Sequence, residues 1–482
     1  MFNIKKIINI ENAIVAIVSS VVSSVLAVVL TLYFQDRGLS AKVHGDQRRA
    51  NLALESGDAQ EALKIYDEIL GVLPADQFSE IVADVYGRKA VCYLAMRRVG
   101  KPGVMLKSAI ASCKEAIEVL GPGDSMPELR GAVLNNLGRA YSMLATSRNK
   151  TVNLGQALDY YERSLKVFVS SGDGLQAALV RSGMCDAYRK LSEVKDALDS
   201  LDAATTLCLA AKDVLGQAGN SYYYAEVLRF MGSVYLRRFE LDGDRRNLSE
   251  AFNMYQMSLD STPEDSYYFE SAETRYLLGN TKIFLYKING DKASLYDAIK
   301  LYIESMEMFG RADYVVDNAI SRTGLGYALV QLYVDDGNDE NLLEAISHFK
   351  ASLSVLNAED YPHLYLRAKN GIATTYGYLA HSKDRATNLK QAIDNLSDVL
   401  RVRPRGQLDL ELVALYNNRG EMYAELADCE NRDQNLRRAL SDFELGIKIL
   451  ATNKNDKYLE IIEKNRRETK NKLIADLPRA DH

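Results

Sequence analysis

The chain of 482 residues has no tryptophan, eight prolines and five histidines. It also has no tract rich in proline, glycine and serine, so little of it suits a disordered linker. The histidines show no metal-ligand spacing, and no CxxC, HExxH, GxSxG or glycine-rich phosphate loop occurs. These absences argue against a catalytic, metal or nucleotide site, and we expect no enzyme activity and no cofactor.

An excess of positive charge is missing as well. The 59 basic and 65 acidic residues give a net charge of -6, and no basic stripe interleaved with aromatics is evident, which argues against nucleic-acid binding. The five cysteines are odd in number and widely scattered: Cys92, Cys113, Cys185, Cys208 and Cys429. This pattern is typical of small buried side chains in a reducing compartment, and we expect no disulfide framework.

What the sequence does have is a repeat of 47 residues. A small residue recurs at this interval: Gly138, Cys185, Gly232, Gly279, Gly326, Ala373 and Gly420. Tyrosine follows three residues later in five of the seven blocks. A small side chain lets a second helix approach closely, and the nearby aromatic ring fills the space beside it. The repeat therefore predicts one helical unit copied in tandem.

A second helix is predicted in each block. Alanine stands 19 residues after the small position in six blocks, and a bulky residue follows four residues later: Tyr161, Tyr255, Tyr302, Phe349, Leu396 and Phe443. We expect the Cys185 block to differ, because Ala197 and Leu201 follow that cysteine early. Four residues before each of the six alanines stands a polar residue predicted to cap the second helix: Asn153, Asn247, Ser294, Asn341, Asn388 and Asn435.

The pattern resembles the tetratricopeptide repeat, in a variety longer than the usual unit of about 34 residues. Near the front, the segment RRANLALESGDAQEALKIYDEILGVLP has the family's residues at Ala50, Gly57, Asp58, Ala62, Tyr66 and Pro74. The resemblance covers residues 46–452 in about nine units. It implies an all-α fold, a right-handed α-solenoid of antiparallel helix pairs, and it is specific for fold but not for function.

A long apolar run precedes the repeats. From Asn12 to Gln35 no residue is charged, and as a helix this run would rise about 36 Å, against roughly 30 Å of hydrocarbon in a bilayer. We predict an uncleaved transmembrane helix; a cleaved signal peptide and a buried core helix are the alternatives. Ala16, Ser20 and Ser24 recur every four residues and could pack two such helices into a homo-oligomer, unless the serines bond to their own backbone.

Flanking charge bears on the orientation of this helix. Two basic residues precede it and four follow it closely: Lys5, Lys6, Arg37, Lys42, Arg48 and Arg49. The bias favours a cytoplasmic repeat domain, although a short N-terminus with lysines often stays inside. The predicted order is a tail over 1–11, the transmembrane helix over 12–35, a connector over 36–45, the solenoid over 46–452, and a capping helix with a tail over 453–482.

In such an array the first helix of each pair lines the concave wall. The residues three before and one after the small position should face that groove, together with one neighbouring asparagine: Asn135, Asn136, Arg139, Arg229, Tyr276, Asn280, Tyr327, Asn370, Asn417 and Glu421. Amide side chains carry a donor and an acceptor that match an extended peptide backbone. The pairs Asn135–Asn136 and Asn417–Asn418 resemble those of peptide-binding members of the family. Alternatively, these asparagines and arginines bond to neighbouring helices.

The sequence thus favours a membrane-anchored scaffold that binds a protein or an extended peptide in its groove and holds it at the lipid bilayer. A ligand-responsive sensor that self-associates through the transmembrane helix is the second hypothesis, and a non-catalytic subunit of an enzyme is the third. A sensor should change its oligomeric state or stability with ligand, whereas a scaffold need not.

Overall fold

The computed structural model describes residues 39, 41–73, 78–96, 102–123, 126–145, 149–195, 197–219, 221–262, 268–311, 314–402, 409–453 and 456–475. Within these ranges all regular structure is helical. The chain divides into two compact units, one of Met1–Met96 with Ala111–Met126, and the other of Arg97–Ile110 with Pro127–His482. Helix α4 (Pro102–Leu120) contributes residues to both units.

The first unit contains a helix over residues 41–55, followed by α2 (Ala59–Val72) and α3 (Ser79–Met96). Asp58 caps α2, because its carboxylate accepts a hydrogen bond of 2.9 Å from the Glu61 amide. Ala50, Ala62 and Tyr66 are fully buried. Three residues that carried the family resemblance thus form the contact between two antiparallel helices, while Gly57 and Asp58 lie in the turn between them and Pro74 lies outside the described residues.

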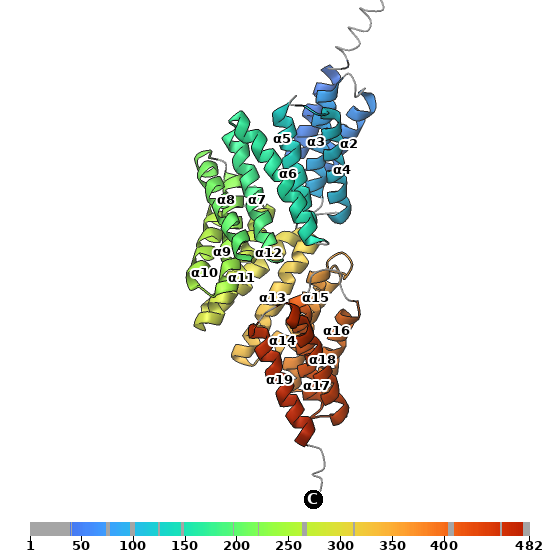
Figure 1. Ribbon diagram of the computed structural model, residues 1–482, viewed down its shortest axis with the longest axis vertical. Helices are drawn as coiled ribbons and strands as arrows, with labels where there is room; N and C mark the ends of the chain where they lie inside the picture. The colour runs from blue at the N-terminus through green and yellow to red at the C-terminus, as the bar shows by residue number, and fades with distance from the viewer. Residues whose placement is uncertain are drawn as a thin grey trace, which may run out of the picture. The chain divides into compact units, whose positions relative to one another are not determined.

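The second unit is a series of helix pairs followed by a last single helix (Figure 1). The pairs are α5 (Pro127–Leu144) with α6 (Lys150–Ser171), α7 (Gly174–Leu191) with α8 (Ala197–Gln217), α9 (Ser221–Asp242) with α10 (Arg245–Asp260), α11 (Tyr268–Asn289) with α12 (Lys292–Arg311), α13 (Val315–Asp336) with α14 (Asp339–Leu353), α15 (Pro362–Ser382) with α16 (Arg385–Val402), and α17 (Asp409–Leu426) with α18 (Arg432–Asn453). Helix α19 (Asp456–Ala475) packs on α18. Each second helix also packs on the first helix of the next pair. The predicted array of helix pairs is confirmed.

The small positions mark where the two helices of a pair touch. A Cβ atom added at Gly138 would lie 2.6 Å from the Tyr161 ring, and one at Gly420 would lie 2.6 Å from the Phe443 ring. Both rings are almost completely buried. The ring that fills the space beside the glycine therefore comes from the second helix, 23 residues on. The tyrosine three residues after the glycine has another role, since Tyr141 stacks on Tyr160 with ring centroids 5.5 Å apart.

The expectation that the Cys185 block would differ is wrong. Leu201, Ala204 and Cys208 are all fully buried in α8 and stand 16, 19 and 23 residues after Cys185, as the equivalent residues do in the other blocks. Ala197 is instead the first residue of α8. The 47-residue register therefore runs unbroken through this block.

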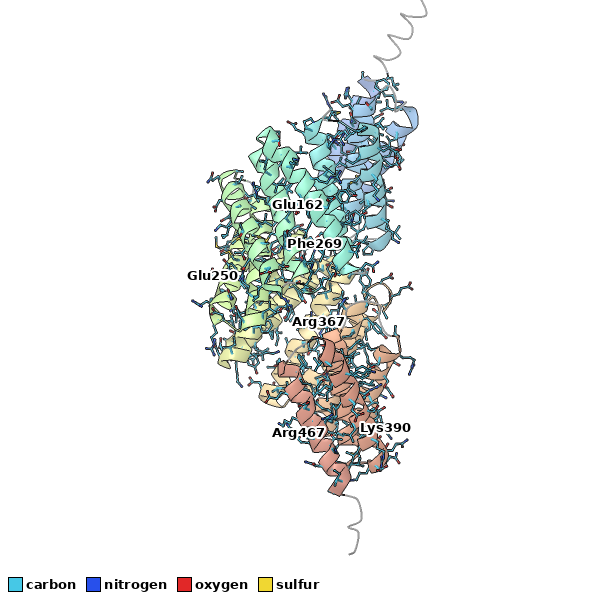
Figure 2. The ribbon with its side chains drawn as sticks, in the orientation of Figure 1. Glu162, Glu250, Phe269, Arg367, Lys390 and Arg467 are labelled. Atoms are coloured by element: carbon cyan, nitrogen blue, oxygen red, sulfur yellow. A yellow bond between two sulfur atoms is a disulfide. The ribbon has the colours of Figure 1, made fainter. Side chains whose placement is uncertain are left out.

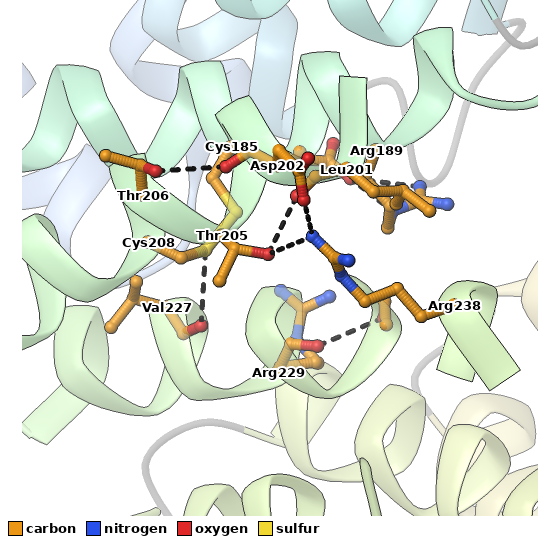
Figure 3. Close-up of a disulfide and its surroundings, with 12 residues drawn as sticks. Cys185, Arg189, Leu201, Asp202, Thr205, Thr206, Cys208, Val227, Arg229 and Arg238 are labelled. Atoms are coloured by element: carbon orange, nitrogen blue, oxygen red, sulfur yellow. Dashed lines mark hydrogen bonds and ion pairs between the residues drawn. A yellow bond between two sulfur atoms is a disulfide. The ribbon is translucent and has the colours of Figure 1, made fainter. Parts of the chain in front are cut away.

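The expectation of no disulfide is also wrong, because Cys185 and Cys208 are bonded, with their Cα atoms 5.5 Å apart (Figure 3). Cys185 occupies the small position and Cys208 the ring position. A covalent bond thus joins α7 to α8 where the other pairs have a small residue against a large one. Beside it, Arg238 of α9 contacts Asp202 and donates a hydrogen bond of 3.2 Å to the Thr205 hydroxyl. The cysteines therefore give no argument for a reducing compartment.

The predicted caps of the second helices are wrong by three or four residues. Helix α10 begins after Asp244, whose carboxylate accepts from the Arg246 amide at 2.9 Å. The predicted cap residues lie inside the first turn and reach backwards instead: Asn388 Nδ2 donates to the Lys383 carbonyl at 2.8 Å, and Asn435 Nδ2 donates to the Glu430 carbonyl at 2.8 Å. These two asparagines satisfy carbonyl groups left without an intrahelical partner after the preceding helix, whereas Asn247 and Asn341 donate to the carboxylates of Asp242 and Asp336.

No helix within the described ranges is long and apolar enough to cross a membrane. The predicted transmembrane segment over 12–35, with Ala16, Ser20 and Ser24, lies outside those ranges. The first described helix already runs through residues 41–45, which the sequence assigned to a connector.

Candidate binding face

The first helices of the second unit lie on the inside of a curve. Consecutive first helices contact one another along the whole series from α5 to α19, whereas consecutive second helices make no comparable contact in the part of the chain described. The curvature is strong near α15, because the Arg367 Nη1 atom donates to the Tyr276 hydroxyl of α11 at 3.1 Å although the pair α13 and α14 lies between them in the chain. We call the surface formed by these first helices the inner face.

The part of the inner face on α5, α7, α9 and α11 is charged. Arg229 is 7% exposed, and its Nη1 atom lies 2.7 Å from the Glu273 carboxylate. Burial would lower the pKa of Arg229, but Glu273 and Glu226 raise it further than burial lowers it. The pKa of Arg139 on α5 shifts in the same way. Burial lowers it, but Glu226 contributes to a larger rise, so the net shift is upward. Both arginines are thus held as cations near acidic side chains.

Asp186 of α7 belongs to the same charged region. Its carboxylate lies 3.0 Å from Arg189 and 2.6 Å from Lys190. Burial raises the pKa of Asp186, but Lys190 and Arg189 lower it well below its ordinary value. Lys190 also donates to the Ser142 hydroxyl of α5 at 3.3 Å. These ion pairs fix charges of both signs on the inner face.

The middle of the inner face, on α11, α13 and α15, is aromatic. The Tyr276 ring lies 5.8 Å from the Tyr302 ring, and Asn280 Oδ1 accepts the Tyr302 hydroxyl at 2.8 Å. The Tyr327 hydroxyl donates to the Arg367 carbonyl at 2.7 Å. Burial raises the pKa of Tyr302 and of Tyr327, so both phenols stay protonated at neutral pH. Arg367 itself is exposed on this surface (Figure 2).

The last part of the inner face, on α15, α17 and α19, is a row of amides. Asn418 Nδ2 donates to Asn370 Oδ1 at 2.9 Å, and Asn465 Nδ2 donates to Asn417 Oδ1 at 3.0 Å. Glu421 accepts from Asn417 at 3.1 Å and from Asn465 at 2.6 Å. Burial raises the pKa of Glu421, while these two amides lower it by less. These amides bond first helix to first helix.

Apart from Arg139, which lies near Glu226, the predicted groove residues fall into two groups. Most use their polar atoms within the protein: Arg229, Tyr276, Asn280, Tyr327, Asn370, Asn417 and Glu421. On α5, Asn135 and Asn136 are half-buried, and the buried Asn135 Oδ1 atom has no hydrogen-bond partner among the described residues. The alternative that these side chains join neighbouring helices thus applies to several of them.

Arg367 and Asn465 were missed by the sequence reasoning. Arg367 stands three residues before Asn370 on the same helix, so it lies on the same face one turn earlier. The 47-residue spacing predicted two groove positions per block, and Arg367 stands one turn before the first of them in its block. Asn465 lies on α19, after the last small position, where no register was available.

No group of histidine, cysteine, aspartate and glutamate within the described ranges could hold a metal ion.

No protein-family model matches the sequence, and no curated protein matches it. Solved structures do match. A Rap protein complexed with Competence and Sporulation Factor has a TM-score of 0.50 and 12% identity, covering 85% of this chain and 99% of that chain. The apo form of the quorum sensor NprR from B. thuringiensis has a TM-score of 0.50 and 16% identity, covering 83% of this chain and 99% of that chain. At these identities the likeness concerns the fold alone, and the chain has a tetratricopeptide-like helical repeat fold.

Proposed function

We propose that the chain is a non-catalytic, membrane-anchored repeat scaffold that binds an extended peptide, or such a segment of a protein, on the inner face. The observation that carries the proposal is the composition of this face, where fixed charges of both signs, tyrosines and amides follow one another along consecutive first helices. An extended peptide presents a donor and an acceptor at every residue and side chains of either charge, so it can use all three regions.

The likeness to the Rap structure supports this proposal in one respect. That protein was solved in complex with Competence and Sporulation Factor. We extend to this chain only the idea that a curved array of helix pairs can hold a ligand. Asn370, Asn417, Asn418 and Asn465 bond to one another, so a ligand on this part of the face would use the lone pairs and N–H groups that these bonds leave over.

Membrane attachment rests on the uncharged run over 12–35. Attachment would confine the search for a partner to the membrane surface and raise the effective concentration of partners that are already there. We propose a cytoplasmic inner face from the four basic residues that follow the run against two that precede it. The Cys185–Cys208 disulfide favours the opposite, oxidising side, so its redox state in cells is the direct test of this orientation.

Photo-crosslinking tests the binding function. A photoreactive amino acid would replace Asn135 of α5 or Asn136 beside it on the inner face, and Glu162, Glu250 or Lys390 on the second helices (Figure 2). The latter three are exposed residues of α6, α10 and α16 and serve as matched controls. We expect one defined partner band from the inner-face positions and none from the controls. The same bands from both sets, or none from the inner face, would contradict the proposal.

The sensor remains the second candidate because of one contact. The hydrogen bond from Arg367 to Tyr276 joins first helices two pairs apart, so a ligand that replaced it would change the curvature between α11 and α15. A sensor of this kind should change its oligomeric state when ligand binds, which sedimentation in detergent with and without ligand would detect.

A further inference from the structure

Arg367 differs in its surroundings from three other arginines of the first helices. Arg229, Arg275 and Arg419 each pair with a carboxylate, at 2.7, 3.1 and 2.6 Å. Arg367 pairs with none among the described residues. Its described hydrogen-bond partner is a phenol, the hydroxyl of Tyr276. A permanent cation thus lies on the inner face of the second unit, and no carboxylate in the described part of the chain pairs with it.

The surroundings hold this guanidinium in place. The Tyr327 hydroxyl donates to the backbone carbonyl of Arg367 at 2.7 Å, and the guanidinium carbon of Arg367 lies 5.6 Å from the centre of the Tyr327 ring. The Tyr276 hydroxyl accepts one N–H at 3.1 Å. Gly324 makes room for the tyrosines, because a Cβ there would lie 2.8 Å from the Tyr302 ring and 3.2 Å from the Tyr276 ring. The site is therefore built from α11, α12, α13 and α15.

Most of the donors of Arg367 are available. A guanidinium has five N–H groups in a fixed plane, and the protein's described hydrogen bonds use one of them, that to Tyr276. The remaining edge has the geometry that binds the two oxygens of a carboxylate. The bond from Arg367 to Tyr276 also orients the phenol, so that the Tyr276 hydroxyl proton can point to a bound oxygen while its lone pair accepts from Arg367.

We infer that Arg367 and Tyr276 form a subsite for one carboxylate group of the peptide that binds the inner face. The inference rests on the proposed function and names the group that the inner face recognises. The carboxylate can be the C-terminus of the peptide or the side chain of an aspartate or glutamate. A long polyanion such as a nucleic acid does not suit the site, because Glu226, Glu273 and Asp186 lie further along the same face.

The test measures the binding of dye-labelled random hexapeptide pools to the purified full-length chain by fluorescence anisotropy. Four pools combine a free or an amidated C-terminus with the presence or absence of aspartate and glutamate. The variants are Arg367→Gln, which removes the charge and keeps an amide, and Tyr276→Phe, which removes the hydroxyl. Arg467→Gln is the matched control, since Arg467 is an exposed arginine of α19 (Figure 2). Circular dichroism and the thermal midpoint confirm that each variant folds.

We expect the carboxylate-bearing pools to bind the unchanged protein at least about tenfold more tightly than the amidated neutral pool, because a hydrogen bond between charged groups typically strengthens binding by about this factor. Arg367→Gln should abolish this preference, Tyr276→Phe should reduce it by a smaller factor, and Arg467→Gln should leave it unchanged. Preference for a free terminus identifies a terminal carboxylate, and preference for acidic pools even when amidated identifies a side-chain carboxylate.

Two results would overturn the inference and can be told apart. If the neutral amidated pool binds as tightly as the others, or a folded Arg367→Gln variant keeps the preference, the carboxylate subsite is wrong while peptide binding stands. If no pool binds the unchanged protein, both the subsite and the proposed binding of peptides fail.

Discussion

The contact between Gly326 and Phe349 gives the sharpest test of how the helix pairs are held. Phe349 of α14 is fully buried. A Cβ added at Gly326 of α13 would lie 2.8 Å from two atoms of this ring, and one added at Gly371 of α15 would lie 2.5 Å from the same two atoms. The backbones of α13 and α15 thus enclose the edge of the Phe349 ring. If the ring moved away from α13, it would move closer to α15.

Replacing Gly326 with alanine therefore has two opposing effects. Alanine favours the helix by about 1 kcal/mol relative to glycine. Overpacking a core costs about 1–3 kcal/mol, and the upper value applies here because the ring has no space to move into. We expect Gly326→Ala to lower the free energy of unfolding by about 2 kcal/mol.

The chain provides both a control and a rescue. Gly155 is exposed in α6, and a Cβ there would have no neighbour within 4 Å, so Gly155→Ala should raise stability by about 1 kcal/mol or less. The block at Ala373 has Leu396 in place of the ring. Combining Gly326→Ala with Phe349→Leu copies this arrangement, and the pair should be less destabilising than the sum of the two single changes.

Urea unfolding followed by circular dichroism gives the free energies, and hydrogen exchange shows whether the loss is confined to α13, α14 and α15. The local measurement is needed because a repeat array can unfold in parts. If Gly326→Ala and Gly155→Ala change stability by the same amount and in the same direction, the reasoning about the small positions is refuted.

Three further predictions concern other parts of the second unit. In the purified protein kept without reductant, digestion should yield linked peptides of Cys185 and Cys208, and replacing both with serine should lower the free energy of unfolding by about 2–4 kcal/mol. In cells, the proposed cytoplasmic inner face predicts unlinked peptides, and linked peptides there would contradict this orientation. Arg419→Met should lower the free energy of unfolding, measured in urea, by about 3 kcal/mol, because it leaves the buried carboxylate of Asp442 unpaired. Adding Asp442→Leu should restore most of this loss. Burial raises the pKa of Glu421 above its ordinary 4.5, so the folded protein loses stability as the pH rises and this carboxyl ionises. Glu421→Gln should therefore raise the free energy of unfolding, relative to the unchanged protein, more at pH 7 than at pH 4. An equal change at both pH values would contradict this.

The helix pairs could be predicted from the sequence because their contacts are local and repeat. The small residue and the large residue 23 positions later meet within one pair, so a single spacing predicts the fold. The caps were misplaced for a related reason. An asparagine near a helix start can accept from the first turn or donate backwards, and only the position of the preceding helix decides that Asn388 and Asn435 donate.

The candidate site was harder to predict because its contacts depend on curvature. Arg367 of α15 contacts Tyr276 of α11 although the pair α13 and α14 lies between them in the chain, and no local pattern shows how closely the first helices approach. The Cys185 block shows a different difficulty. Ala197 stands at a plausible spacing for the start of the contact, so the sequence predicted the wrong register for this block. Ala204 and Cys208 stand 19 and 23 residues after Cys185, where the other blocks have their alanine and their large residue. The bond between Cys185 and Cys208 followed from that register.

Hydrogen exchange with and without a bound partner tests the central claim most directly. The ligand would be the partner recovered by crosslinking or the tightest peptide pool. The account predicts slower exchange in α11, α13 and α15, with α12, α14 and α16 unchanged, because the ligand lies on the first helices. Protection centred on the second helices, or none while the ligand stays bound, would contradict the claim that the inner face is the binding surface.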